Sequence, residues 1–129
     1  MMTRHFNTLF IILPLPPTLV VGVYKQNKME ELIKKVIDWG EPKGLTENRP
    51  MLKSWPQYEK VQEEAQEIAR SLVNNDRDGL IDGLGDTMVT LILLAKQNSL
   101  DIQECLEYAY NEIKGRTGKT VKGKFVKDS

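Results

Sequence analysis

The chain has 129 residues, which is enough for one domain with one core, and 40% hydrophobic with 28% charged residues is ordinary for a globular protein. Eighteen basic residues balance eighteen acidic ones, so no net field directs the chain toward nucleic acid or a membrane surface. The single cysteine, Cys105, excludes an intrachain disulfide and fits a reducing cytoplasm. The single histidine, His5, lies in a segment that we do not expect to belong to the fold. This composition excludes a Ser-His-Asp triad, a Cys-His dyad and a zinc site built on Cys and His. Any catalysis must therefore use carboxylates, basic side chains or an oxygen-bound metal.

The first 28 residues differ in composition from the rest. The run from Leu9 to Val23 is apolar, but three prolines interrupt it, and it falls short of the roughly 20 residues that span a bilayer. The prolines and the lack of a small-residue cleavage site also argue against a secretory signal. We expect residues 1–28 to be an N-terminal extension outside the fold and residues 29–129 to form the domain.

Helical periodicity begins at Met29. Apolar residues from Leu32 to Ile37 recur at the spacing of one helix face, and this first helix should end at Trp39-Gly40. A loop rich in proline and glycine covers residues 40–56. A second helix is predicted from about residue 55 to 74, and its apolar face carries Tyr58, Val61, Ala65, Ile68 and Leu72.

The third predicted helix, over about residues 77–96, is apolar on two sides. Asn75 or Asp76 can cap its start. A helix that is apolar on two sides is expected to lie between packing partners. One stripe comprises Leu80, Leu84, Met88, Leu91 and Ala95, and the nearly opposite side carries Val89 and Leu93.

A fourth helix is expected after Asp101, which can serve as its N-cap. Its residues predicted to point inward are Ile102, Leu106, Ala109, Tyr110 and Ile113. Residues 115–129 can form a short hairpin around Lys122-Gly123. The predicted fold is therefore all-α, a four-helix arrangement with a short C-terminal hairpin or tail.

Two clusters of acids lie on neighbouring predicted helices. The second helix holds Glu63, Glu64 and Glu67, and the third holds Asp82 and Asp86 one turn apart. The two aspartates share a side with Val89 and Leu93, so we expect them to be partly buried. Buried like charges repel one another unless a cation joins them.

A helical hairpin across the short turn would place Glu64 and Glu67 opposite Asp82 and Asp86. Such an oxygen-only site favours Mg²⁺, with Mn²⁺ as the alternative, and carboxylate-bound Mg²⁺ usually takes further ligands from substrate phosphates. Acidic helix faces are also commonly just solvated, so spacing alone leaves both interpretations open.

The acidic motifs resemble those of the MazG-like nucleoside triphosphate pyrophosphohydrolases. Residues 63–67, Glu-Glu-Ala-Gln-Glu, match the EExxE motif of that family, and Leu84-Gly85-Asp86 matches the end of its second acidic segment. Residues 36–39, Gln57, Lys60 and the segment 110–116 also resemble family positions. The likeness covers roughly residues 29–127.

The resemblance implies a four-helix fold completed by dimerisation and a metal bound by Glu64, Glu67 and Asp86. The fourth acidic position of the family falls on Gly83, and Asp82 is the nearest substitute. Gly83 and Gly85 each cost a helix about 1 kcal/mol relative to alanine. They can admit another backbone or the nucleotide, or simply allow close helix packing.

Phosphate contacts are expected from basic residues. The resemblance suggests Lys60 and, after the fourth helix, Asn111, Lys114 and Arg116; arginine suits bidentate phosphate binding. A solvated basic tail is the alternative for the lysines beyond Lys119. Trp39 and Trp55 flank the proline-rich loop and can either stack on a base or anchor the loop.

The function implied is Mg²⁺-dependent hydrolysis of a nucleoside triphosphate, NTP or dNTP, to a monophosphate and pyrophosphate. Glu63 or Glu67 can act as the base. The resemblance also implies a homodimer or homotetramer, and we expect no nucleic-acid or membrane partner and a cytoplasmic location. One alternative is a dUTP- or phosphoribosyl-ATP-type enzyme of the same superfamily. The other is an inactive helical interaction module, which stays possible because Gly83 occupies the position of a family acid.

Overall fold

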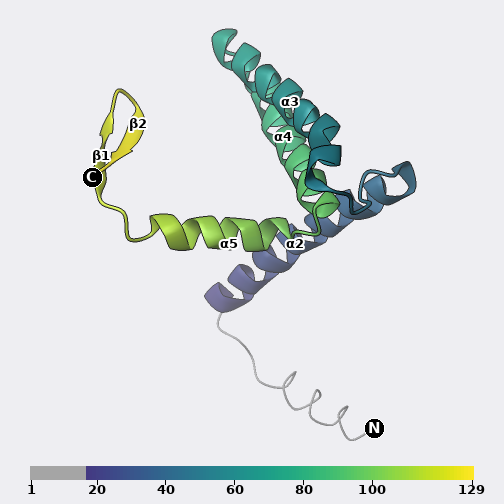
Figure 1. Cartoon of the computed structure of the whole chain (residues 1–129). Helices are drawn as coiled ribbons and strands as arrows, with labels where there is room; N and C mark the ends of the chain where they lie inside the picture. Colours follow the sequence, from purple (N-terminus) through teal and green to yellow (C-terminus); the bar gives the residue numbers. More distant parts are fainter. Residues whose placement is uncertain (1–16) are drawn as a thin grey trace, which may run out of the picture. The chain divides into compact units, whose positions relative to one another are not determined.

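The structure, a computed structural model, describes residues 17–129, with side chains from residue 28 onward. This part of the chain contains four α-helices and one two-stranded hairpin (Figure 1), which confirms the predicted all-α class. The helices are α2 (Pro17–Gly40), α3 (Trp55–Val73), α4 (Arg77–Gln97) and α5 (Ile102–Ile113). Two short 3-10 helices, η1 (Glu41–Lys43) and η2 (Met51–Ser54), lie between α2 and α3, and the strands are β1 (Gly118–Val121) and β2 (Lys124–Lys127).

The chain divides into two compact units, and α2 crosses the boundary between them. The second unit comprises residues 36–129 and contains every candidate site residue. Helix α2 begins at Pro17, so its helical backbone extends further upstream than the start at Met29 that the periodicity predicts. Residues 1–16 of the expected extension lie outside the described residues, and the domain boundary at Met29 stays a prediction.

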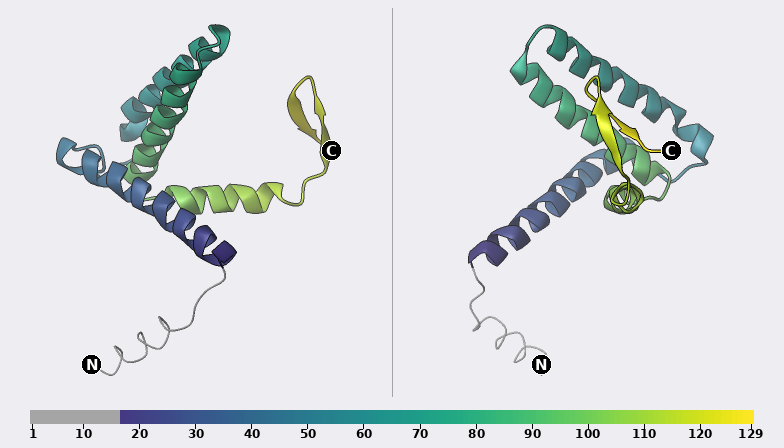
Figure 2. Two further views of the ribbon diagram at one scale, coloured as in Figure 1. Left: turned by 180° about the vertical axis from the view of Figure 1, so that it is seen from behind. Right: turned by 90° about the vertical axis from the view of Figure 1, so that its left-hand side faces the viewer.

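Helices α3 and α4 form an antiparallel pair, which lies side by side in all three views (Figures 1 and 2). The turn between them is short because Asn75 takes a positive φ of 51° and Asp76 caps α4. The Asp76 Oδ1 atom accepts a hydrogen bond of 3.0 Å from the Gly79 backbone N–H. The predicted cap and the predicted limits of both helices are confirmed to within one residue.

A glycine allows the close approach of α3 to α4. A Cβ atom built on Gly83 would lie 3.1 Å from Ile68 Cγ1 and 3.3 Å from the Ile68 backbone nitrogen. Contacts that close require the opposite helix to move, so Gly83 sets the spacing of the helix pair. No atom lies within 4 Å of the corresponding position on Gly85, so Gly85 has no such role.

The buried core is small and partly polar. Its buried apolar side chains are those of Ile92, Leu93 and Ala95, all on α4. The buried polar residues are Ser54, Gln57, Ser71, Thr90 and Gln97. Much of the interior of the α3–α4 pair is therefore organised by hydrogen bonds.

Two predicted apolar faces remain largely exposed in the part of the chain that the structure describes. On α4 the side with Val89 and Leu93 packs inward. On the other stripe Ala95 is buried, but Leu84, Met88 and Leu91 are exposed. The prediction that α5 points Leu106 and Tyr110 inward is also wrong, because both side chains are exposed. Periodicity locates an apolar face correctly, but among residues 36–129 no surface covers these two.

The C-terminal segment forms the predicted hairpin. Strands β1 and β2 pair antiparallel, with Val121 opposite Lys124. Lys122 and Gly123, with φ values of 51° and 79°, make the two-residue turn, the conformation that suits a tight hairpin. Among residues 17–129, no helix has the length and apolar composition needed to cross a membrane.

Candidate active site

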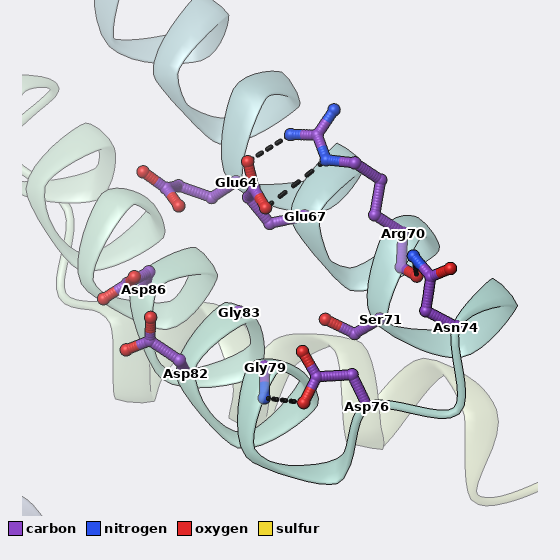
Figure 3. Close-up of a pocket in the computed structure, with 10 residues that line it drawn as sticks. All are labelled: Glu64, Glu67, Arg70, Ser71, Asn74, Asp76, Gly79, Asp82, Gly83 and Asp86. Carbon is purple, nitrogen blue, oxygen red and sulfur yellow. Dashed lines mark hydrogen bonds and ion pairs between the residues drawn. The ribbon is translucent and has the colours of Figure 1, made fainter.

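The four acids predicted to bind a metal line one open pocket on the α3–α4 pair, which we call the carboxylate pocket (Figure 3). Its volume is about 470 Å³. It is lined by Glu64, Glu67, Arg70, Ser71, Asn74, Asp76, Gly79, Asp82, Gly83 and Asp86. All four residues predicted to hold a metal are therefore on one surface, and two come from each helix.

The two glutamates each have a cation on their own helix. The carboxylate of Glu64, 17% exposed, lies 3.5 Å from the Lys60 Nζ atom. Glu67 is 52% exposed and forms an ion pair with Arg70, which reaches it from one turn away (Figure 3). The hydrogen bond to Glu67 raises the pKa of Arg70 above its ordinary value. Both carboxylates thus already attract positive charge.

The two aspartates lie one turn apart on α4, with their carboxylates beside one another (Figure 3). Both are exposed, so the expectation of partial burial is wrong. The reason is geometric: Gly83, between them in sequence, is the residue that faces α3, and this turns Asp82 and Asp86 to the rim of the pair. Water can solvate both charges there, which removes the cost that burial would impose.

The carboxylates of these four acids do not all point at one common position. As the side chains stand in the described part of the chain, no three acidic, histidine or cysteine groups lie close enough to hold a metal ion. Glu63 lies outside the pocket and pairs with Lys60 at 3.1 Å. This hydrogen bond is the main cause of the raised pKa of Lys60.

A second pocket, which we call the amide pocket, adjoins the first. Its volume is about 500 Å³, and Glu64 and Asp86 line both pockets. Its other lining residues are Trp39, Leu45, Arg49, Pro56, Gln57, Lys60, Val89, Thr90, Leu93 and Gln97. The predicted residues Trp39 and Lys60 therefore lie next to the acids.

Three of the predicted phosphate-binding residues lie elsewhere. Asn111 is on α5, Lys114 caps the end of α5, and Arg116 follows in the turn before β1. All three are exposed, and none lines either pocket. Trp55 also lies outside both pockets and packs against Tyr58, with ring centroids 4.9 Å apart.

Two residues that line the pockets, Arg70 and Gln97, were not predicted from the sequence, and Gln57 was named only for its resemblance to a family position. Arg70 lies three residues after Glu67, and that spacing could have revealed the ion pair. Gln57 and Gln97 meet across a separation of 40 residues, through a hydrogen bond of 3.3 Å between their amides. No local pattern encodes that meeting.

The comparisons with known proteins agree with the acidic motifs. The model of the phosphoribosyl-ATP pyrophosphohydrolase family matches residues 26–111. A protein of Haemophilus phage HP1, described as an uncharacterized 18.2 kDa protein in the rep-hol intergenic region, is 34% identical over 73 residues. The match covers 57% of this chain and 43% of the phage protein, so the chain spans less than half of that relative. No solved structure matches the chain.

The family model covers both acidic motifs and the helices that carry them. Its members are pyrophosphohydrolases, which hydrolyse acid anhydrides, and they form part of the MazG-like all-α superfamily. The resemblance to MazG-like proteins thus holds at the level of the superfamily. The chain belongs to the phosphoribosyl-ATP pyrophosphohydrolase family.

Proposed function

We propose that this protein hydrolyses a phosphoanhydride bond of a nucleotide and releases pyrophosphate and a nucleoside monophosphate. One observation carries the proposal: the acids of both motifs line one pocket, and a second pocket shares two of them. Glu64 and Asp86 belong to both pockets, so one elongated ligand can occupy the two together. A nucleotide, with phosphates at one end and a base at the other, has that shape.

The donor set of the carboxylate pocket fits Mg²⁺, or Mn²⁺ in its place. Glu64, Glu67 and Asp86 supply only oxygen ligands, and Asp82 stands in for the acid that Gly83 replaces. Lys60 and Arg70 already bring positive charge to Glu64 and Glu67, which supports the inference that these carboxylates attract a cation. When bound, Mg²⁺ would neutralise phosphate charge and lower the pKa of water.

The chain itself would orient the substrate and accept a proton. Water attacks a phosphorus atom, a new P–O bond forms, the anhydride P–O bond breaks, and pyrophosphate leaves. The water proton passes to a carboxylate, for which Glu67 is better placed than Glu63, because Glu67 lines the pocket and Glu63 does not. Glu67 must first leave Arg70, and this exchange would free the guanidinium for a phosphate oxygen.

Two substrate classes fit this proposal. A nucleoside triphosphate, NTP or dNTP, follows from the acidic motifs, and phosphoribosyl-ATP follows from the family match. The test is to assay pyrophosphate release from NTPs, dNTPs, dUTP and phosphoribosyl-ATP with Mg²⁺ or Mn²⁺. We expect release from at least one class and none after chelation with EDTA. No release from any of them, with either metal, would contradict the proposal.

An inactive interaction module is the alternative, and Gly83 is the observation that favours it. The position that carries a family acid here contacts Ile68 across the helix pair. Such a protein would show neither pyrophosphate release nor metal-linked stabilisation. The assay above therefore separates the two functions.

We also propose that the protein works as a homodimer or a homotetramer. The open stripe with Leu84, Met88 and Leu91 on α4, and Leu106 and Tyr110 on α5, support this proposal. Contiguous exposed apolar patches often mark contact surfaces. Light scattering of the purified chain measures the mass, and a monomer at micromolar concentration would contradict the proposal.

A further inference from the structure

The amide pocket combines apolar walls with a polar floor. Trp39, Leu45, Val89 and Leu93 supply carbon surfaces, and Gln57 and Gln97 supply amides. Its volume of about 500 Å³ is in the range of small-molecule sites, which are mostly apolar with a few fixed polar groups. Trp39 keeps about half of its surface exposed and can contact a planar group.

The floor is a hydrogen-bond chain with a fixed direction. Gln57 Nε2 donates to the Thr90 carbonyl oxygen at 3.1 Å. Gln97 Nε2 donates twice, to the Leu45 carbonyl oxygen at 3.0 Å and to Gln57 Oε1 at 3.3 Å. Rotating either amide by 180° would set oxygen against oxygen. The orientation of both side chains therefore follows from two backbone carbonyls.

This direction leaves one acceptor unpaired. Gln97 is only 1% exposed, and its Oε1 atom accepts no hydrogen bond. An unpaired buried acceptor destabilises the folded state, and most buried polar atoms have a hydrogen-bond partner in the protein or in ordered water. A ligand in the amide pocket can supply the missing partner here. Both hydrogens of Gln97 Nε2 are already used, so the amide presents an acceptor and no free donor.

We propose that the amide pocket binds the nucleobase of the substrate and that Gln97 Oε1 selects bases carrying an exocyclic amino group. This inference rests on the proposed function, because the phosphates must occupy the adjoining carboxylate pocket. The two residues shared by the pockets, Glu64 and Asp86, lie where the sugar and phosphates would pass. Cytosine and adenine offer an amino donor to Gln97, whereas uracil and hypoxanthine offer a carbonyl oxygen at the same ring position.

The first test changes the substrate and leaves the protein intact. CTP and UTP differ at one ring position, where amino replaces oxo, and ATP and inosine triphosphate differ in the same way. We expect kcat/KM to favour the amino member of each pair by about tenfold or more, because the oxo group would face an unpaired acceptor. N4,N4-dimethyl-CTP, which lacks both amino hydrogens, should behave like UTP.

The second test changes the acceptor. Gln97→Met has a similar length, cannot donate and accepts only weakly, so the preference for amino over oxo bases should fall to nearly one. The matched control is Gln103→Met, the same substitution at an exposed position of α5 outside both pockets, which should keep the preference. If Gln97→Met does not fold, the dimethyl substrate removes the same hydrogen bond from the ligand side.

The outcomes separate this inference from the proposed function. Pyrophosphate release with equal kcat/KM for both members of each pair would overturn the base selection and leave the activity standing. If no nucleotide is hydrolysed, the activity fails, and calorimetry of CMP and UMP still decides about the pocket. CMP binding about tenfold tighter than UMP supports the selection, and equal binding or no binding of either overturns it.

Discussion

The two pockets share Glu64 and Asp86 but differ in how their side chains are held. In the carboxylate pocket Glu67, Asp82 and Asp86 are exposed to water. In the amide pocket Gln57 and Gln97 are buried and hydrogen-bonded to each other. One pocket thus has charges that can rearrange, and the other has polar groups that the fold fixes.

This difference predicts different consequences of substitution. An exposed acid contributes little to the folded state, so replacing it should affect chemistry and leave stability nearly unchanged. A buried amide satisfies other buried groups, so replacing it should affect stability as well as selectivity. Substitutions in the two pockets can therefore be told apart by measuring turnover and unfolding on the same variants.

The largest expected effect comes from Asp86→Asn. Loss of one ligand oxygen should lower kcat by at least about a hundredfold, because even outer partners of metal ligands cost 10–100-fold. The free energy of unfolding of the metal-free protein should stay the same or rise slightly, since one negative charge is removed beside Asp82. The measurements are pyrophosphate release and urea unfolding. The control is Asp78→Asn, on the same helix but outside both pockets.

Asp82→Asn determines whether Asp82 replaces the acid missing at Gly83. If Asp82 is a ligand, kcat should fall nearly as far as in Asp86→Asn, and the KM for the metal should rise. Assays over a range of Mg²⁺ concentrations measure both values. If the kcat of Asp82→Asn stays within about twofold of the wild-type value, Asp82 is not a metal ligand, and three acids would hold the metal.

The smallest effects concern the spacing of the two helices. Gly83→Ala should lower the free energy of unfolding by about 1–2 kcal/mol, because a Cβ atom would press on the Ile68 backbone and outweigh the gain in helix propensity. Gly85→Ala, where the position is open, should raise it by up to about 1 kcal/mol. Urea unfolding of the two variants gives both numbers. Equal shifts in the two would mean that α3 and α4 are not in close contact at Gly83.

Local patterns predicted most of the secondary structure and the four acids that line the carboxylate pocket. The limits of α3 and α4, the Asp76 cap and the turn at Lys122-Gly123 follow from neighbouring residues, and each is confirmed. The start of α2 at Pro17 was not predicted. The four acids were placed on one surface because two helices joined by a short turn must lie side by side. That reasoning needs only spacing along the chain.

The features that were missed depend on distant contacts. Gln57 and Gln97 form a pocket floor only after α3 packs on α4, and nothing near either residue indicates the other. The exposure of Asp82 and Asp86 also depends on packing, because Gly83 turns them to the rim. Apolar periodicity on α4 and α5 predicted buried faces, but periodicity alone does not show whether another part of the chain covers a face.

The most direct test of the carboxylate pocket is a titration of the metal-free protein with Mg²⁺, followed by thermal unfolding. A ligand that binds only the folded state stabilises it by about 2.7 kcal/mol at a hundred times its Kd. We expect the Tm of the wild type and of Asp78→Asn to rise with Mg²⁺, and the Tm of Asp86→Asn to stay constant. A wild-type Tm that does not change with Mg²⁺ or Mn²⁺, or an equal rise in Asp86→Asn, would contradict the assignment of these acids as the metal site.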